Sequence, residues 1–222
     1  MKKSKNIITR FFQNICNKFL PKSFYGFFLF LRFRNKFKRS INRPKSANLY
    51  SKNLDSINNY EFKVTSQNNE DGIIEYIFKK IPNNKIFVEI GMGYYEFNSL
   101  YLIKNHWSGL LIEADTNIFK KFKKNYLNNK NITISNERCS KENSLNEIFN
   151  KNDIKELDLL SLDIDGIDLT VIKLLNFNKY RPKIIIIEYN IFIPIDISYE
   201  DENDTGNQSS ALAINEFLNR KN

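Results

Sequence analysis

The stretch K-I-F-V-E-I-G-M-G-Y-Y at positions 85–95 constrains the fold of this chain more than any other feature. An apolar run ends in an acidic residue, Glu89, and then breaks into two glycines, Gly91 and Gly93. This pattern is typical of a buried parallel strand that leads into a tight turn beneath a nucleotide-like ligand. Glycine suits the turn because a Cβ atom would obstruct both the turn and the approach of a ligand to the backbone. Alone the pattern is weak, and the segments that follow it decide its meaning.

Further apolar segments follow at regular intervals and are separated by helical patterns. The predicted strands are residues 86–90, 109–113, 132–135, 157–163 and 184–188. The predicted helices are residues 66–81, 97–104, 117–125, 144–149, 169–175 and 209–219. Strands that are apolar throughout and alternate with helices indicate a parallel sheet covered on both faces. The predicted fold class is therefore α/β, with a doubly wound Rossmann-like sheet.

Charge divides the chain into two parts. Residues 1–52 hold fourteen of the 34 Lys and Arg residues and none of the 25 Asp and Glu residues. The net charge of +9 therefore separates into +14 for this part and −5 for the remainder. We predict a basic amphipathic N-terminal extension at 1–41, a polar linker at 42–60 and the α/β domain at 61–222. An acidic domain gives no sign of nucleic-acid binding.

The N-terminal extension has the pattern of a basic amphipathic helix, with apolar residues at spacings of three and four from Ile8 to Leu20. Such a helix can lie on an anionic membrane, dock on a protein partner or cover one side of the domain. The apolar patch at 24–33 is too short to cross a bilayer, which needs about 20 residues. We expect a cytoplasmic protein, peripheral at the membrane if the extension binds there, with Cys16 and Cys139 as free thiols. The sequence leaves the oligomeric state open.

Acidic residues end four of the five predicted strands. In sheets of this class the ligand binds beyond the carboxyl ends of the strands. Each acid taken alone can be a helix cap or part of a solvated turn. Together along one edge they predict a functional crevice, and the residues concerned are Glu89, Glu113, Asp115, Asp163, Asp165 and Glu188.

Five segments, in chain order, resemble S-adenosylmethionine (SAM)-dependent methyltransferases of the FkbM-like family, over residues 62–215. They are S-Q-N-N-E-D-G-I-I-E-Y-I-F, V-E-I-G-M-G, W-S-G-L-L-I-E-A-D, D-L-L-S-L-D-I-D-G and I-I-I-I-E-Y-N. The D-I-D-G and I-E-Y-N segments are the more specific, because the glycine turn fits any Rossmann-like domain. The resemblance implies an O-methyltransferase that uses SAM and acts on a sugar hydroxyl of a glycan, a glycolipid or a small metabolite.

The resemblance also implies which residues bind the cofactor. Glu89 and the two glycines would hold its methionine portion, and Glu113 would accept hydrogen bonds from both ribose hydroxyls. Asp115 is a further candidate beside Glu113. Asn136, after the third predicted strand, is a candidate for contact with the adenine.

Asp163, Asp165 and Glu188 are the predicted catalytic residues. Asp163 would face the methionine amino group or the substrate, and the other two would line the acceptor side. A hydroxyl nucleophile must lose its proton, so Asp163 or Asp165 is the expected general base. Asp163, Glu188 and Asn190 would also suit Mg²⁺, but carboxylates meet at strand ends without metal and we assign no metal ligand. His106 precedes a strand on the side away from the crevice and is interpreted as structural.

Two features depart from the family pattern. Tyr94 and Tyr95 follow the glycine turn, where relatives carry a small residue, and they either stack on a ligand or fill the core. After the last predicted strand only an acidic loop and a helix remain, without the antiparallel strands that usually complete such a sheet. The alternative function is therefore a catalytically degenerate binding or scaffold protein. A nucleotide-dependent oxidoreductase is disfavoured, because the third glycine and a Tyr-x-x-x-Lys pair are missing.

Overall fold

The computed structural model of this chain describes residues 56–93, 97–126 and 128–221, all of which belong to the unit Leu49–Asn222. The predicted extension at 1–41 and most of the predicted linker lie outside these residues. Membrane or partner contact through the extension therefore stays a prediction. Within the described residues, no helix has the length and apolar character needed to cross a membrane.

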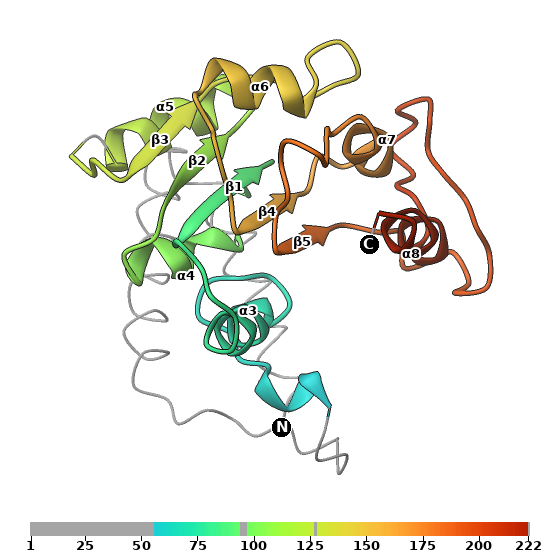
Figure 1. The fold of residues 1–222 in the computed structure, drawn as a ribbon. Helices are drawn as coiled ribbons and strands as arrows, with labels where there is room; N and C mark the ends of the chain where they lie inside the picture. The colour runs from blue at the N-terminus through green and yellow to red at the C-terminus, as the bar shows by residue number, and fades with distance from the viewer. Residues whose placement is uncertain (1–55, 94–96, 127, 222) are drawn as a thin grey trace, which may run out of the picture. The chain divides into compact units, whose positions relative to one another are not determined.

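Five parallel strands form one sheet in the order β3-β2-β1-β4-β5 (Figure 1). They are β1 (Ile86–Ile90), β2 (Ser108–Ile112), β3 (Ile132–Ser135), β4 (Leu159–Leu162) and β5 (Ile184–Ile187). At the centre, Val88 of β1 pairs with Leu110 on one side and with Leu160 on the other. The strand order reverses between β1 and β4, and at such a point an open α/β sheet forms its ligand crevice.

One helix connects each pair of successive strands, which confirms the predicted α/β alternation. These are α4 (Ser99–Lys104), α5 (Thr116–Tyr126), α6 (Leu145–Lys151) and α7 (Asp168–Lys173), while α3 (Glu70–Phe78) precedes β1 and α8 (Ala211–Asn219) follows β5. Among the residues that the structure describes, no strand follows β5. Residues 188–210 instead form an irregular segment that leads into α8.

The first described helix begins at Glu70 and not at residue 66, where the sequence predicts it. The reason is Asp71, which is fully buried and accepts the N–H groups of Thr65 at 2.6 Å and Ser66 at 3.0 Å. These bonds hold the preceding residues in a loop. Before this loop, the 3-10 turn η1 (Ile57–Tyr60) lies within the range predicted as linker.

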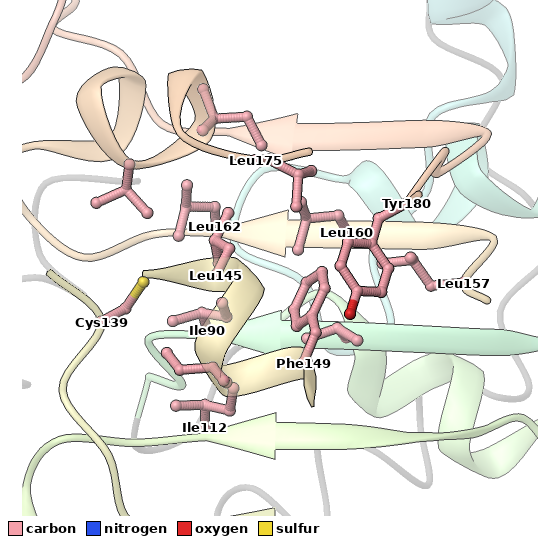
Figure 2. Close-up of a cluster of buried hydrophobic side chains, with 14 of the residues drawn as sticks. Ile90, Ile112, Cys139, Leu145, Phe149, Leu157, Leu160, Leu162, Leu175 and Tyr180 are labelled. Carbon is pink, nitrogen blue, oxygen red and sulfur yellow. The ribbon is translucent and has the colours of Figure 1, made fainter. Parts of the chain in front are cut away.

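The two faces of the sheet carry separate cores, because successive side chains of a strand point to opposite faces. One core joins alternate strand residues to α6, α7 and α8. In Figure 2, Leu145 and Phe149 of α6 face the strand residues Ile90, Ile112 and Leu160. On the strands, Phe87, Leu111 and Leu159 are also buried but lie outside this cluster.

Cys139 belongs to the α6-side core and is a buried free thiol, as the sequence predicts (Figure 2). Burial raises the pKa of this thiol to about 12, and the negative charge of Asp168 adds to the shift. The second cysteine, Cys16, lies outside the described residues.

A buried acid holds the starts of three neighbouring strands together. Asp158, 2% exposed, accepts the N–H groups of Asn84 at 2.9 Å and Ile86 at 3.0 Å, and it forms an ion pair with Lys183 at 2.7 Å. Because these residues precede or begin β1, β4 and β5, the strands start at a common level. Their carboxyl ends therefore also meet along one edge.

Candidate active site at the carboxyl ends of the strands

Gly91 turns the chain directly after β1, with a φ of +82°. Its N–H donates to the Ile112 carbonyl at 3.1 Å, which ties the turn to the end of β2. A Cβ atom at this position would lie 1.5 Å from the carbonyl oxygen of Asp163, beyond β4. Packing between the ends of β1 and β4 therefore requires this glycine before any ligand is considered. Gly93 is exposed, and the two tyrosines that follow it lie outside the described residues.

Glu89, on β1, is 3% exposed, and protein donors occupy its carboxylate. It accepts the N–H groups of Asn98 at 2.9 Å and Ser99 at 2.7 Å, where α4 begins, and the Ser161 hydroxyl at 3.4 Å. Burial raises the pKa of Glu89 to about 7, although these donors oppose the shift. The carboxyl group of Glu89 thus anchors the start of α4. Its contact with a cofactor stays a prediction.

Glu113 follows β2 and is 8% exposed. One carboxylate oxygen accepts the N–H of Asp115 at 2.7 Å. Burial raises the pKa of Glu113, and nearby N–H groups, including that of Met92 in the glycine turn, offset only part of the shift. The Glu113 side chain therefore lies beside the glycine turn, where the predicted ribose contact would be made.

Asp115 and Asn136 bind neighbouring protein groups. Asp115 accepts the N–H groups of Asn117 at 2.6 Å and Ile118 at 3.1 Å, so it caps the start of α5. Asn136 donates from Nδ2 to the Glu113 carbonyl at 2.7 Å, which connects the segments after β3 and β2. Both residues lie at the predicted edge of the sheet, and their contacts within the protein hold the loops of that edge.

Asp163, Asp165 and Glu188 form a second group, which we call the acid cluster. One carboxylate oxygen of each lies within 4.8 Å of the others. The Asp163 and Glu188 side chains are hydrogen-bonded to each other. Burial, and then the bond to Asp163 and its charge, raise the pKa of Glu188 to about 8, and burial also raises that of Asp163. Both shifts therefore favour the protonated forms of this pair.

Asp168 supports the acid cluster and was missed by the sequence analysis. It is fully buried at the start of α7 and accepts the N–H groups of Ile164 at 3.0 Å and Gly166 at 3.2 Å. These bonds hold the turn in which Asp165 adopts a φ of +59°, a conformation that residues with a Cβ atom rarely take. Burial raises the pKa of Asp168 to about 6, against the effect of the two N–H groups. The third acid in D-I-D-G-I-D was the available signal, because it falls in the first turn of a helix.

Gln208 is the second residue that the sequence analysis missed. Its Nε2 donates to Glu188 Oε2, across 20 residues of chain. Asn190, which the sequence analysis named only as a residue that would suit Mg²⁺, uses its side chain elsewhere: Nδ2 donates to the Asn207 carbonyl, and Oδ1 accepts the Phe192 N–H at 2.9 Å. The acid cluster has the oxygen chemistry that Mg²⁺ prefers. Exposed acids also meet without an ion, and we assign no metal ligand.

A cavity among the described residues lies at the opposite ends of the strands. This cavity, of about 390 Å³, is lined by residues of α3 and α4, together with Lys85 and Trp107, which precede β1 and β2. None of the predicted site residues lines this cavity. His106, also on this side, is exposed before β2, and its interpretation as structural stays a prediction.

Residues 140–221 match the family model described as the methyltransferase FkbM domain. The matched range includes β4, β5 and the acid cluster, and it begins after the Gly91 turn and Glu113. The match confirms the FkbM resemblance over this range. Together with a parallel sheet flanked by helices, it indicates a Rossmann-like methyltransferase. Comparisons with curated proteins and with solved structures find no match.

Proposed function

We propose that this chain is a SAM-dependent O-methyltransferase whose acceptor is a sugar hydroxyl of a glycan, a glycolipid or a small metabolite. The observation that carries the proposal is the position of the acid cluster: it lies within the range that matches the methyltransferase domain, at the carboxyl ends of β4 and β5. The sugar is proposed from the family resemblance. The hydroxyl is proposed because a carboxyl pair suits the removal of its proton.

The groups along this edge of the sheet suit the chemistry of SAM. A carboxylate beside the glycine turn, that of Glu113, can accept hydrogen bonds from ribose hydroxyls. The backbone carbonyl of Asp163 lies against the Gly91 turn, and the Asp163 carboxylate can face a cationic amino group. When bound, SAM would supply a methyl group already activated by its sulfonium. The protein would then contribute position and proton transfer.

The Asp163–Glu188 pair is the proposed general base. Two carboxyl groups whose pKa values are raised can take up a proton when an acceptor hydroxyl binds between them. Asp165 adds negative charge beside the pair and raises the pKa of Glu188. Asp163 or Glu188 would touch the acceptor oxygen, and Asp165 would line the acceptor side.

A second candidate is a catalytically degenerate binding or scaffold protein. The observation that favours it is that the carboxyl groups of Glu89 and Glu113 already accept backbone N–H groups of the protein. Fewer acceptors then remain for a cofactor. Whether SAM binds at all separates this candidate from the enzyme.

Isothermal titration calorimetry with SAM tests the proposal. We expect the wild-type chain to bind SAM with a micromolar dissociation constant, within the usual range for enzyme ligands. Glu113→Gln should weaken binding by about tenfold or more, because it removes a charge-assisted hydrogen bond. Asp153→Asn is the matched control, since Asp153 is exposed near the opposite ends of the strands and Asn tolerates its φ of +55°.

A folded wild-type chain that binds no SAM would overturn the enzyme proposal and favour the degenerate domain. Gly91 variants are unsuited to this test, because a side chain there would strike the Asp163 carbonyl and disturb the fold. Once binding is established, transfer of a labelled methyl group to a panel of sugars would test the proposed acceptor class.

A further inference from the structure

The segment between β5 and α8 folds back over the acid cluster. Gln208 comes from this segment and donates its amide to Glu188 Oε2. Nearby, the Asp204 carboxylate covers Gly166, where a Cβ atom would lie 2.6 Å from Asp204 Oδ1. The segment thus contacts both the turn that carries Asp165 and the side chain of Glu188.

Asp201 organises this segment from within. It is 1% exposed and accepts the N–H of Thr205 on both oxygens, at 3.1 and 3.0 Å, and the N–H of Asn207 at 3.0 Å. The Thr205 hydroxyl donates to it as well, at 2.9 Å. Burial alone would raise the pKa of Asp201, but these donors outweigh burial and lower it. The carboxylate therefore stays charged near neutral pH and keeps the turn closed around it.

Hydrogen bonds hold the two residues on either side of Gln208, Asn207 and Ser209. Asn207 is held by Asp201, while Ser209 accepts the Asp201 N–H on Oγ at 3.2 Å and the Asn190 N–H on its carbonyl at 2.9 Å. Between them Gln208 has a φ of +55°, in the left-handed region that a glutamine seldom occupies. Surrounding structure must impose such a conformation, and residues of this kind gather at functional sites.

We propose that Gln208 is a positioning residue that fixes the orientation of the Glu188 carboxyl in the acid cluster. An amide N–H₂ can only donate, so the Glu188 oxygen that receives it, Oε2, is reserved as an acceptor. The other oxygen, Oε1, is then the one that carries a proton and faces Asp163 or an acceptor hydroxyl. The catalytic meaning of this orientation rests on the proposed function, whereas the orientation itself can be measured without it.

The groups around Glu188 explain why a neutral donor matters there. The three charged groups that act on it, from the turn after β4 and from α7, are all acids: Asp163, Asp165 and Asp168. Each opposes the charged form of Glu188, whereas the Gln208 amide favours it by donating a hydrogen bond. Loss of this donor should therefore shift the titration of Glu188 to higher pH.

The test is a ¹³C NMR titration of the Glu188 side-chain carboxyl between pH 5 and about 11, with the signal assigned from a Glu188→Gln variant. Gln208→Leu should raise the midpoint by about half a unit to one unit, because the amide donor is lost. Gln208→Glu keeps the size of the side chain but adds a carboxyl group, so it should raise the midpoint further. Asn203→Ala, an exposed position in the same segment, should leave the midpoint unchanged.

Wild-type midpoints in both Gln208 variants would overturn the proposal. If Gln208→Leu does not fold, the near-isosteric Gln208→Glu decides the question. SAM titration of the same samples separates the two proposals. Wild-type chain that binds no SAM contradicts the proposed function and leaves the Glu188 comparison intact. Unchanged midpoints with normal SAM binding contradict only the positioning role.

Discussion

Acidic side chains make different contacts on the two sides of this sheet edge. After β1 and β2, the carboxyl groups of Glu89 and Glu113 are bonded to backbone N–H groups of the protein. After β4 and β5, the carboxyl groups of Asp163 and Glu188 are bonded to each other. The first pair completes the structure of loops and helix starts. The second pair consists of titratable groups at the carboxyl ends of the strands.

This difference shows that an acid at a strand end is not in itself a functional residue. An acid that accepts two backbone N–H groups lowers the energy of the fold and has little capacity left for a ligand. Where two acids face one another, the charge of one raises the pKa of the other, as Asp163 raises that of Glu188, and such a pair can exchange a proton with a bound molecule. The distinction depends on which donors the loop after each strand offers. We call the β1–β2 side, where acids accept backbone N–H groups, the structural side, and the β4–β5 side, where two titratable acids meet, the chemical side.

The largest effect is expected at Gly91, which joins the two sides. Gly91→Ala places a Cβ atom 1.5 Å from the Asp163 carbonyl at a positive φ, and it should cost about 4 kcal/mol of unfolding free energy or more. Gly206→Ala is the matched control: φ is +75°, but the nearest atom to the new Cβ is 3.9 Å away, so only about 1 kcal/mol is expected. Urea denaturation followed by the fluorescence of Trp107, the one tryptophan, measures both. Equal losses of unfolding free energy would show that the positive φ, and not contact with Asp163, determines the cost of Gly91→Ala.

The next effect separates the structural from the chemical side directly. Glu89→Ala should lower the unfolding free energy by about 3 kcal/mol, because it leaves the N–H groups of Asn98 and Ser99 without their acceptor. Glu188→Ala should change it by less than about 1 kcal/mol, since it also relieves the repulsion from Asp163. The same denaturation experiment compares them at pH 7. A loss at Glu188 as large as that at Glu89 would mean that both sides are structural.

The smallest effect is a dependence of stability on pH. The folded-state pKa of Glu89 is raised from 4.5 to about 7, so the unfolded chain releases this proton first as the pH rises. Unfolding free energy should therefore fall between pH 5 and pH 8, by about 2 kcal/mol from this residue. Asp168, raised to about 6, acts in the same direction. Asp201, whose pKa is lowered, contributes no slope in this window.

Glu89→Gln is the diagnostic variant for this pH dependence. It removes the titrating group, so its stability curve between pH 5 and pH 8 should be flatter than that of the wild type. Glu188→Gln should alter the curve less, because its carboxyl group is more open to solvent. A wild-type stability that rises with pH in this window would contradict the raised pKa of Glu89.

The sheet was predictable because its signals are local and repeated. The predicted bounds of β1 and β3 match the structure residue for residue. β4 begins at Leu159, two residues later than predicted, because Asp158 is used to bond the start of β1. The start of the first helix was misplaced for a similar reason, since Asp71 holds the polar residues before it in a loop. In both cases a side chain accepted backbone N–H groups, which periodicity does not reveal.

The site was predictable only in part. Parallel strand ends meet at one edge, so sequence reasoning correctly brought Asp163, Asp165 and Glu188 together. Sequence reasoning could not show that Glu89 anchors the start of α4, because the N–H groups that Glu89 accepts lie nine and ten residues further along the chain. Nor could it find Gln208, whose contact depends on the path of an irregular segment.

The buried thiol of Cys139 can report on local opening of the core near the acid cluster. Alkylating reagents attack a thiolate, and Cys139 has a pKa of about 12 and is buried, so it should react mainly when its surroundings open. Part of that high pKa comes from the charge of Asp168, the residue that holds the turn of Asp165. In a Cys16→Ser background, the labelling rate of Cys139 would thus measure how often the core around Cys139 and Asp168 opens.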